Sequence, residues 1–295
     1  MKTIATHSGA FHADEVFAIA TLFLAFSEEE ITIVRTRDEA LITSAHIAVD
    51  VGRKYDVGEF RFDHHQEGGA GVRDNGVPYA SFGLIWKEYG PALLGGNMEA
   101  WEYLDQRIVC PIDAIDNGVA LSTNLYKDIY SFTVQDVIAS YHGGFEVSEE
   151  ENQKDFMEAV SFAQAILGRE IKKALEYQTL QKLVIESYEQ SSQKEIIVLD
   201  GKYPWVEALI ARPEPVFVVY PDRESGRWRA KGVPVTVRSF ERRKLFPVSW
   251  AGKTDAELQE VSGVPGALFC HTGRFIVVAD SKEAVIALAE KALAH

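Results

Sequence analysis

The apolar positions of residues 1–62 fall into short β-branched runs separated by longer stretches with helical spacing. Runs of Val, Ile and Thr between polar residues are typical of buried strands, whereas apolar residues every three or four positions indicate helices. This pattern predicts helices at Glu15–Phe26 and Asp38–Ser44, and strands at Lys2–Thr6, Ile31–Thr36, His46–Val51 and Phe60–Phe62. Strands that alternate with helices predict an α/β fold with a mainly parallel sheet and helices on both faces.

One segment further along the chain, Glu149–Glu189, predicts a long helix. It contains no proline and one glycine, Gly168, and its apolar residues repeat at helical spacing. Shorter helices are predicted before it at Ser81–Tyr89, Glu99–Val109 and Thr133–Tyr141. After it, the pattern predicts strands at Ile196–Leu199, Val216–Tyr220, Trp228–Lys231, Ala267–Cys270 and Phe275–Ala279. A last helix is predicted at Lys282–Leu293. We therefore expect an N-terminal domain over 1–148, a linker helix over 149–193 and a smaller α/β domain over 194–295.

The composition is that of an ordinary globular protein, and it indicates the cellular compartment in which the chain is expected. Of the 295 residues, 46% are hydrophobic and 25% are charged, and no apolar run approaches the ~20 residues of a membrane-spanning helix. The polar cluster that begins at His7 is unlike a signal peptide. Cys110 and Cys270 both lie in apolar surroundings, so we expect buried free thiols. A reducing compartment follows, and we expect a cytoplasmic protein without a membrane partner.

Charge is distributed unevenly along the chain. The net charge is −14, which argues against a protein that coats nucleic acid electrostatically. Residues 1–193 carry 15 basic and 31 acidic groups, whereas residues 194–295 carry 15 basic and 13 acidic groups. The segment 223–244 alone holds eight basic residues and two acidic ones. If these charges are more than solvated faces, the first part is suited to holding cations and the second to holding an anionic substrate.

Side chains that bind metals follow three of the predicted strands. These histidines and aspartates are His7, His12, Asp14, Asp50, Asp63, His64 and His65. Alone, each would more often be a hydrogen-bonded structural residue or a helix cap than a ligand. Ligands bind at the carboxyl ends of strands in open α/β sheets, however, so these side chains are expected to face one crevice. Imidazole together with carboxylate suits Mn²⁺, Fe, Co or Zn, and Asp113 and Asp116 offer further oxygen ligands.

The order of these motifs resembles a known group of enzymes. The Asp63-His64-His65 tripeptide, after an earlier His/Asp loop and the strand end VDVG, resembles the DHH phosphoesterase superfamily. That superfamily includes RecJ-type exonucleases, oligoribonucleases that also cleave cyclic dinucleotides, and manganese-dependent inorganic pyrophosphatases. The chain is more similar to one branch, the melanocyte proliferating gene (Myg-type) family, through THSGAFHADE, IVRTRD, VDVGRKYD, RFDHHQ, SFGLIWKEYG, DAIDNGV and VSGVPGALFCHTGRF. This resemblance spans nearly the whole chain. It implies a DHH-type metal-binding catalytic domain, a linker helix and a C-terminal substrate domain, with the activity of a metal-dependent hydrolase and 3′–5′ RNA exonuclease.

The resemblance implies a role for each motif residue. The first superfamily motif, a histidine followed by Asp-x-Asp, corresponds to His7 and to His12-Ala13-Asp14, with one extra residue in the loop. His12 thus stands where a carboxylate usually stands, and this neutral imidazole favours Mn²⁺ over Mg²⁺. Asp50 corresponds to the aspartate expected to bridge two metals, and His64 to the metal ligand of the DHH motif.

Further residues complete the implied catalytic site. Asp63 is expected to orient an imidazole from outside the metal ligands, and His65 is expected to face the substrate phosphate. The last metal ligand is either Asp113 or Asp116. We favour Asp116, because the Asn-Gly that follows it would make a tight turn and expose its side chain.

The basic C-terminal region supplies candidates for substrate binding. The strongest is the turn His271-Thr-Gly-Arg274, whose glycine lets the backbone approach an anion closely. Trp228 is a candidate for stacking on a base. The phosphate-binding candidates are Arg227, Arg229, Lys231, Arg238, Arg242, Arg243, His271, Gly273 and Arg274. Each arginine alone is about equally well explained as a surface charge. The glycine-rich stretch 68–76 lacks the Gly-Lys-Ser/Thr of a P-loop and is expected to form a mobile loop beside the site.

The sequence therefore predicts a metal-dependent phosphodiesterase, a 3′–5′ exonuclease on RNA or short oligonucleotides that uses hydroxide attack at two divalent metal ions. Mn²⁺ is favoured, with Mg²⁺, Co²⁺ or Zn²⁺ as alternatives. Three other interpretations stay open: an inorganic pyrophosphatase, a cyclic-dinucleotide phosphodiesterase and a non-catalytic metal-dependent nucleotide-binding module. RNA or an oligonucleotide is the expected partner, and a homodimer is one option for the assembly.

Overall fold

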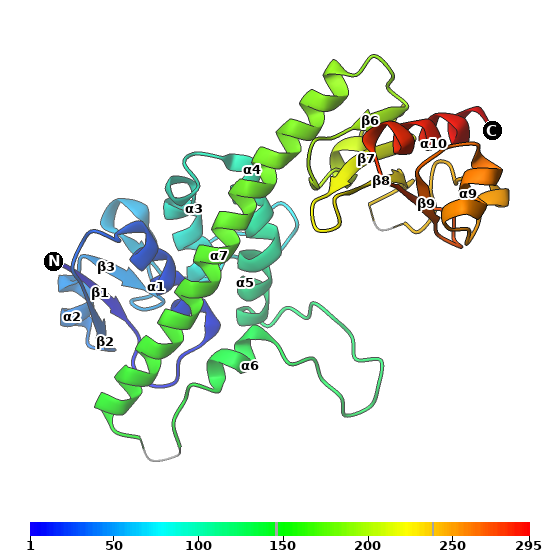
Figure 1. Cartoon of the computed structure of the whole chain (residues 1–295). Coiled ribbons are helices and arrows are strands. Elements are labelled where there is room, and N and C mark those ends of the chain that lie inside the picture. The colour runs from blue at the N-terminus through cyan, green and yellow to red at the C-terminus, as the bar shows by residue number, and fades with distance from the viewer. Residues whose placement is uncertain (145–146, 238) are drawn as a thin grey trace. The chain divides into compact units, whose positions relative to one another are not determined.

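The computed structural model describes residues 1–144, 147–237 and 239–295, which form two compact units, Met1–Leu175 and Glu176–His295 (Figure 1). Each unit has a sheet and a hydrophobic core of its own. Among the described residues, no helix has both the length and the apolar character that crossing a membrane requires. The α/β class predicted from the sequence is confirmed in both units.

The sheet of the first unit has the strand order β2-β1-β3-β5-β4. The strands are β1 (Lys2–Thr6), β2 (Ile31–Arg35), β3 (Ile47–Val49), β4 (Tyr55–Asp56) and β5 (Arg61–Phe62). All neighbouring pairs are parallel except β4 with β5, which is antiparallel at the edge. The predicted mainly parallel sheet is thus confirmed. The sequence pattern does not predict β4, because a strand of two residues is too short to show an alternation of apolar and polar positions.

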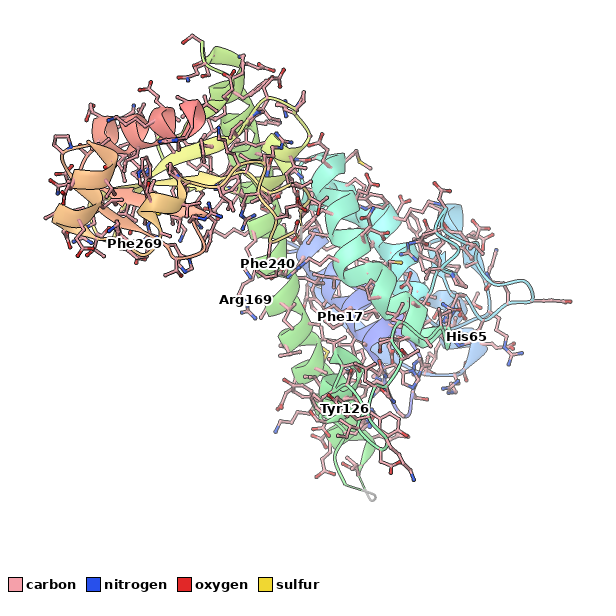
Figure 2. The ribbon with its side chains drawn as sticks, turned by 90° about the vertical axis from the view of Figure 1, so that its right-hand side faces the viewer. Phe17, His65, Tyr126, Arg169, Phe240 and Phe269 are labelled. Atoms are coloured by element: carbon pink, nitrogen blue, oxygen red, sulfur yellow. The ribbon has the colours of Figure 1, made fainter. Side chains whose placement is uncertain are left out.

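Helices cover both faces of this sheet, as the alternation of elements predicts. α1 (Ala13–Ala25) follows β1, and α2 (Glu39–Ser44) follows β2. Ile4 of β1 belongs to the larger core cluster, together with Phe17 of α1 (labelled in Figure 2). Its neighbour Ala5 points to the opposite face and packs with Ile42 of α2. The carboxyl ends of β1, β3 and β5 therefore lie at one edge of a sheet that is buried on both sides.

Four more helices of the first unit precede the long helix. They are α3 (Ser81–Leu93), α4 (Met98–Leu104), α5 (Cys110–Asp116) and α6 (Val134–Ala139), and a π-helical segment, Asp105–Val109, connects α4 to α5. α5 is absent from the sequence prediction, which ends a helix at Val109. Pro111 obscures the pattern there, although proline is well tolerated in the first turn of a helix.

The long helix predicted at Glu149–Glu189 is present as α7 (Glu149–Gln190). Its first half contributes Phe156, Val160 and Leu167 to the core of the first unit. The division between the two units falls at Leu175, inside α7. The first half of α7 thus packs as part of the first unit. The division into a domain over 1–148, a linker over 149–193 and a domain over 194–295 stays a prediction.

The second unit has the strand order β6-β7-β8-β10-β9. The strands are β6 (Ile196–Val198), β7 (Phe217–Asp222), β8 (Arg227–Gly232), β9 (Ala267–Cys270) and β10 (Ile276–Ala279). Only β6 and β7 pair in parallel. The helices are α8 (Val206–Ile210), α9 (Asp255–Ser262) and α10 (Lys282–Ala294). The sequence pattern misses α8 and α9, because each buries too few residues to show a helical period.

Candidate metal centre

Three parallel strands deliver the histidines and aspartates of the first unit to one edge of its sheet. His7 follows β1, Asp50 follows β3, and the Asp63-His64-His65 tripeptide follows β5 (His65 is labelled in Figure 2). Asp50 adopts φ 55°, in the left-handed region that aspartate tolerates better than most residues. Its backbone N–H still donates to the carbonyl of Phe62, 3.0 Å away, so the chain turns immediately after this bond.

Asp50 is the hub of the group. Its Oδ2 lies 3.4 Å from Nε2 of His7, and its Oδ1 lies 3.3 Å from Nδ1 of His65 and 3.5 Å from Nε2 of His64. The hydroxyl of Ser81 also donates to Oδ1, at 3.1 Å. Burial alone would raise the pKa of Asp50, but its histidine partners lower that pKa well below the usual range. Asp50 is therefore an anion with one oxygen directed to each side of the group.

His64 lies between two carboxylates. Its Nε2 is 3.1 Å from Oδ2 of Asp116 and 3.5 Å from Oδ1 of Asp50. This buried nitrogen nevertheless has no hydrogen-bond partner of suitable direction among the described residues. Burial would lower the pKa of His64, yet the two carboxylates raise it to about 11. A buried imidazole nitrogen that converges with carboxylate oxygens, without a well-directed hydrogen bond to the described part of the chain, fits a divalent metal.

Asp14 contributes a further carboxylate near His64. It is fully buried, and its two oxygens accept the backbone N–H groups of Ser81 and Phe82 at 2.9 and 2.7 Å. Asp14 therefore caps α3, rather than its own helix α1, whose N-cap is His12. Burial and then the charge of Asp50 and other carboxylates raise its pKa well above the usual value. Ligand atoms of Asp14, His64 and Asp116 all lie within 4.8 Å of one another, and a bound cation would relieve their repulsion.

A second cluster forms around His7 and includes a residue that sequence reasoning missed. Nε2 of His7 lies 2.8 Å from Oε1 of Glu15, which is fully buried. Burial would lower the pKa of His7, but Asp50 and Glu15 raise it to about 10. The carboxylate of Glu15 also accepts the backbone N–H of His12 at 2.9 Å, while the side chain of His12 is exposed. The available signal was a carboxylate inside a strongly apolar helix, because a buried charge requires a partner.

Asp63 orients His65 rather than His64. Oδ1 of Asp63 lies 2.8 Å from Nδ1 of His65 and accepts its backbone N–H at 3.0 Å, while Oδ2 accepts the backbone N–H of Arg53 at 2.6 Å. Asp50 and Asp63 together raise the pKa of His65 to about 9, against its partial burial. The side chain of His65 is 56% exposed. An imidazole fixed through Nδ1 and open to solvent can reach a ligand from the rim of the group.

The two candidate aspartates of α5 have different partners. Asp116 lies beside His64, whereas Oδ2 of Asp113 lies 2.7 Å from Nη1 of Arg73 and its Oδ1 accepts the N–H of Gly83 at 3.0 Å. Asp116 is the last residue of α5, so the tight turn expected after it is the end of a helix. Gly118 has φ 71°, and the N–H of Val119 donates to the carbonyl of Ala114. The structure thus brings Asp116 into the metal-type group and leaves Asp113 outside it.

The chain matches the family model MYG1_exonuc, described as Uncharacterised protein family (UPF0160), over residues 3–293. It is 31% identical to a MYG1 protein of Dictyostelium discoideum, over 99% of this chain and 96% of that one. It is 30% identical to the MYG1 exonuclease of Homo sapiens, over 99% of this chain and 86% of that one. The protein belongs to the MYG1 family. This confirms the family predicted from its motifs. RecJ from Thermus thermophilus, solved in complex with Mn²⁺, covers all of this chain and 52% of its own at 13% identity, with a TM-score of 0.30, too low to establish a shared fold.

The glycine-rich stretch 68–76 is anchored in this MYG1-family protein. Arg73 is only 9% exposed and pairs with Asp105 and Asp113 at 3.0 and 2.7 Å. Its guanidinium also lies 4.1 Å from the ring centroid of Tyr79. The buried ion pairs of this arginine tie the stretch to α5 and to the π-helical segment. The mobility expected of the stretch stays a prediction.

The predicted substrate residues of this MYG1-family chain belong to the second unit. Arg227 is exposed, and Lys231 is partly buried. Nδ1 of His271 accepts the N–H of Gly273 at 2.9 Å, and Arg274 adopts φ 55°, so these residues form a tight turn after β9. Arg238 lies outside the described residues. Trp228 faces α10, where Nζ of Lys282 lies 5.6 Å from its ring centroid, so the structure does not favour the predicted role of Trp228 in stacking on a base.

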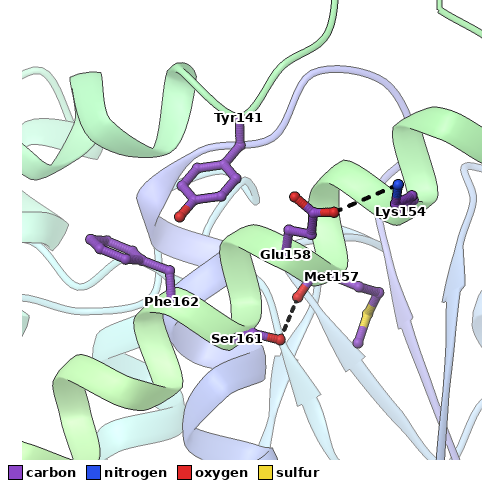
Figure 3. Close-up of a pocket in the computed structure, with 6 residues that line it drawn as sticks. All are labelled: Tyr141, Lys154, Met157, Glu158, Ser161 and Phe162. Atoms are coloured by element: carbon purple, nitrogen blue, oxygen red, sulfur yellow. Dashed lines mark hydrogen bonds and ion pairs between the residues drawn. The ribbon is translucent and has the colours of Figure 1, made fainter.

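An open pocket of about 560 Å³ lies elsewhere on the first unit (Figure 3). It is lined by Tyr141, after α6, and by residues of α7 that include Met157 and Phe162. In Figure 3, Lys154 and Glu158 form an ion pair along α7, 3.8 Å apart. None of the histidines and aspartates at the strand ends lines this pocket, so it is separate from the metal-type group.

Proposed function

We propose that the protein is a divalent-metal-dependent phosphoesterase, a 3′–5′ exonuclease that acts on RNA or short oligonucleotides. The observation that carries the proposal is the convergence of the buried Nε2 of His64 with the carboxylates of Asp50 and Asp116. The names of the human and mouse relatives, MYG1 exonuclease, support the nuclease assignment.

Asp50 supports the proposal of two metal positions. Its Oδ2 is directed to His7, and its Oδ1 to His64 and His65, so a shared carboxylate stands between two sets of ligands. The proposed ligands are His7, His12, Asp14, Asp50, His64 and Asp116. Mn²⁺ is favoured, because imidazoles stand where an all-oxygen site would suit Mg²⁺. When bound, such ions would acidify a water molecule and offset charge on the phosphoryl oxygens.

The remaining residues of the group prepare its geometry. Glu15 holds the ring of His7, and Asp63 holds the ring of His65, as carboxylates commonly do for histidines at metal sites. His65 is the candidate to donate a hydrogen bond from Nε2 to a phosphoryl oxygen, because its Nδ1 faces Asp63 and its ring is exposed. Asp63 and His65 thus act as a pair, one positioning the other.

The second unit is proposed to bind the phosphates of the substrate chain. The candidates are Arg227, Lys231, Arg238, His271, Gly273 and Arg274. The balance of charge supports this division, since residues 194–295 are slightly basic and residues 1–193 strongly acidic. An acidic surface repels a polyanion except where bound cations intervene.

A substrate panel tests the proposal. The purified protein with Mn²⁺ would be given a ten-nucleotide RNA labelled at either end, DNA of the same sequence, pyrophosphate, a cyclic dinucleotide and a p-nitrophenyl phosphodiester. We expect stepwise release of mononucleotides from the 3′ end of the RNA, lost with Asp50→Asn. Hydrolysis of pyrophosphate or of the cyclic dinucleotide alone would replace the proposal with one of those activities. Tight nucleotide binding without hydrolysis would indicate a binding module.

A further inference from the structure

The sheet of the second unit is covered unevenly on its two faces. One face packs against α9 and α10 through a core cluster that includes Val219 and Ala230. On the other face, the buried cluster contains Ile197 and Val218 from β6 and β7, together with residues of α7 and α8. Further along that face Phe269 of β9 is 36% exposed (labelled in Figure 2). The part of this face formed by β8, β10 and β9 is called the open face here.

The strand register shows which side chains share the open face. Arg229 of β8 is paired with Val278 of β10, and Val278 is paired with Phe269 of β9. Residues directly opposite each other in neighbouring strands project from the same face, as do residues two apart along a strand. Arg229, Lys231 and Phe269 therefore project together, with Arg229 about 10 Å from Phe269 across two strand spacings.

Lys231 of this face lies near several other cations. Burial lowers its pKa, and the positive charges of Arg229, Arg242 and Lys202 lower it further. The chain at 242–244 runs against the end of β8: a Cβ placed on Gly232 would lie 3.3 Å from Cβ of Arg242, on the face opposite to Lys231. Arg242 therefore lies beside the end of β8, and three separate segments place positive charge near one partly buried ammonium group.

These cations are not neutralised as a group by the part of the chain that the structure describes. Arg229 pairs with Asp222, but no described carboxylate lies within ion-pair distance of Lys231, Arg242 or Lys202. The Nε atoms of Arg229 and Arg242 are buried and have no hydrogen-bond partner there. Gathering like charges and unpaired donors in a partly buried place destabilises the fold, which an anionic ligand would offset.

We propose that the open face binds single-stranded nucleic acid, with Lys231 holding a backbone phosphate and Phe269 stacking on a base. The inference rests on the proposed function, because it states how the substrate of that reaction is held. A phosphodiester supplies the missing anion, and charge-assisted bonds to it are strong. The exposed ring of Phe269 on the same face offers a surface on which a base can stack. Inorganic phosphate has no group that would use this ring. Phe269 thereby takes the role that the sequence suggested for Trp228.

Binding of a fluorescein-labelled ten-nucleotide oligoadenylate to the full chain, in EDTA so that nothing is cleaved, tests the proposal. We expect Lys231→Met to weaken binding about tenfold and to reduce the salt dependence by roughly 0.7 in the log–log slope. Lys231→Arg should retain most of the affinity. Lys282→Met removes the same charge from the opposite face of the sheet and should bind like the wild type.

A second comparison separates the ring from the charge. Phe269→Leu should weaken binding of the oligoadenylate about fivefold to tenfold but leave binding of an abasic oligonucleotide of the same length unchanged, and Phe269→Tyr should restore it. The proposal is overturned if Lys231→Met and Lys282→Met have equal effects, or if Phe269→Leu weakens both ligands equally. Wild-type hydrolysis of a p-nitrophenyl phosphodiester with Mn²⁺ is measured in parallel. If the oligonucleotide binds through Lys231 but the phosphodiester is not hydrolysed, the proposed phosphoesterase activity is refuted and the proposed binding by the open face stands. If the phosphodiester is hydrolysed but binding does not depend on Lys231, the activity stands and the binding surface is refuted.

Discussion

Oδ2 of Asp113 lies 2.7 Å from Nη1 of Arg73, and both side chains are buried. The same guanidinium pairs with Asp105 at 3.0 Å. Asp113 therefore neutralises a buried cation, whereas Asp116, three residues further along α5, lies 3.1 Å from Nε2 of His64. Two aspartates of one short helix serve different partners, so their variants should fail in different ways.

Asp113→Asn should destabilise the fold. The change removes one partner of a buried ion pair, which typically costs about 3 kcal/mol or more of unfolding free energy. Urea unfolding of the metal-free protein measures this loss. Gly83→Ala gives an independent check in the same direction, because its Cβ would lie 1.9 Å from Oδ2 of Asp113. If Asp113→Asn were as stable as the wild type but failed to bind Mn²⁺, Asp113 would be a ligand after all.

Asp116→Asn should show the opposite behaviour. Its side chain is partly exposed and has no arginine partner among the described residues, so the unfolding free energy of the metal-free protein should change by less than about 1 kcal/mol. Calorimetric titration should show weaker Mn²⁺ binding, and phosphodiester hydrolysis should fall by about 10²-fold. Unchanged metal affinity together with full activity would remove Asp116 from the proposed ligand set.

Asp50→Asn should reduce activity by about 10²-fold or more while the fold persists, because Asp50 contributes the charge shared by both sides of the group. Asparagine is the appropriate replacement, since it tolerates the left-handed conformation at φ 55°. Asp50→Ala would confound the result with backbone strain. Circular dichroism and metal stoichiometry are the controls, and a variant with normal turnover would reduce Asp50 to a strand-end cap.

The sequence predicts the location of the group better than its internal pairing. Parallel strands share one edge, so the residues after β1, β3 and β5 had to converge wherever the strands were correctly identified. The choice between Asp113 and Asp116 depends on Arg73, which comes from a loop 40 residues earlier and leaves no periodic signal. The pairing of Glu15 with His7 is likewise a tertiary contact. The exposure of Phe269 depends on the register of three strands, which a single strand pattern does not contain.

Stability should fall with rising pH in the metal-free protein, and bound metal should remove most of this pH dependence. The pKa values of His7 and His64 are raised to about 10 and 11, from an ordinary 6.5. A histidine whose pKa is raised in the folded state stabilises the protein fully below its unfolded pKa, and that stability is lost as the pH rises towards the folded pKa. The melting temperature in EDTA should therefore fall from pH 6.5 to pH 9. The raised pKa of Asp14 acts in the same direction.

Mn²⁺ should offset this trend. A metal binds the deprotonated imidazole, so protons compete with it and its apparent affinity should increase with pH. The increase in melting temperature on adding a fixed Mn²⁺ concentration should thus grow between pH 6.5 and pH 9. His64→Gln should reduce both the decline in EDTA and the gain with Mn²⁺. A melting temperature in EDTA that rises over this range would contradict the assigned pKa shifts.

The turn after β9 should affect the binding of long substrates more than the chemistry. Arg274 adopts φ 55°, and its Nη1 donates to the carbonyl of Phe246 at 3.3 Å. Arg274→Asn is therefore a cleaner test than alanine, because asparagine suits this backbone conformation. We expect Arg274→Asn and His271→Ala each to lower kcat/KM for a ten-nucleotide RNA about tenfold, mainly through KM, since each removes about one charge-assisted phosphate contact. Both variants should hydrolyse a small phosphodiester, which has no further phosphates, at nearly the wild-type rate. Their Mn²⁺ stoichiometry should also be unchanged, because the proposed ligands all belong to the first unit. Equal losses on both substrates would instead place these residues at the reacting phosphate, and wild-type efficiency on both would mean that the turn does not bind the substrate.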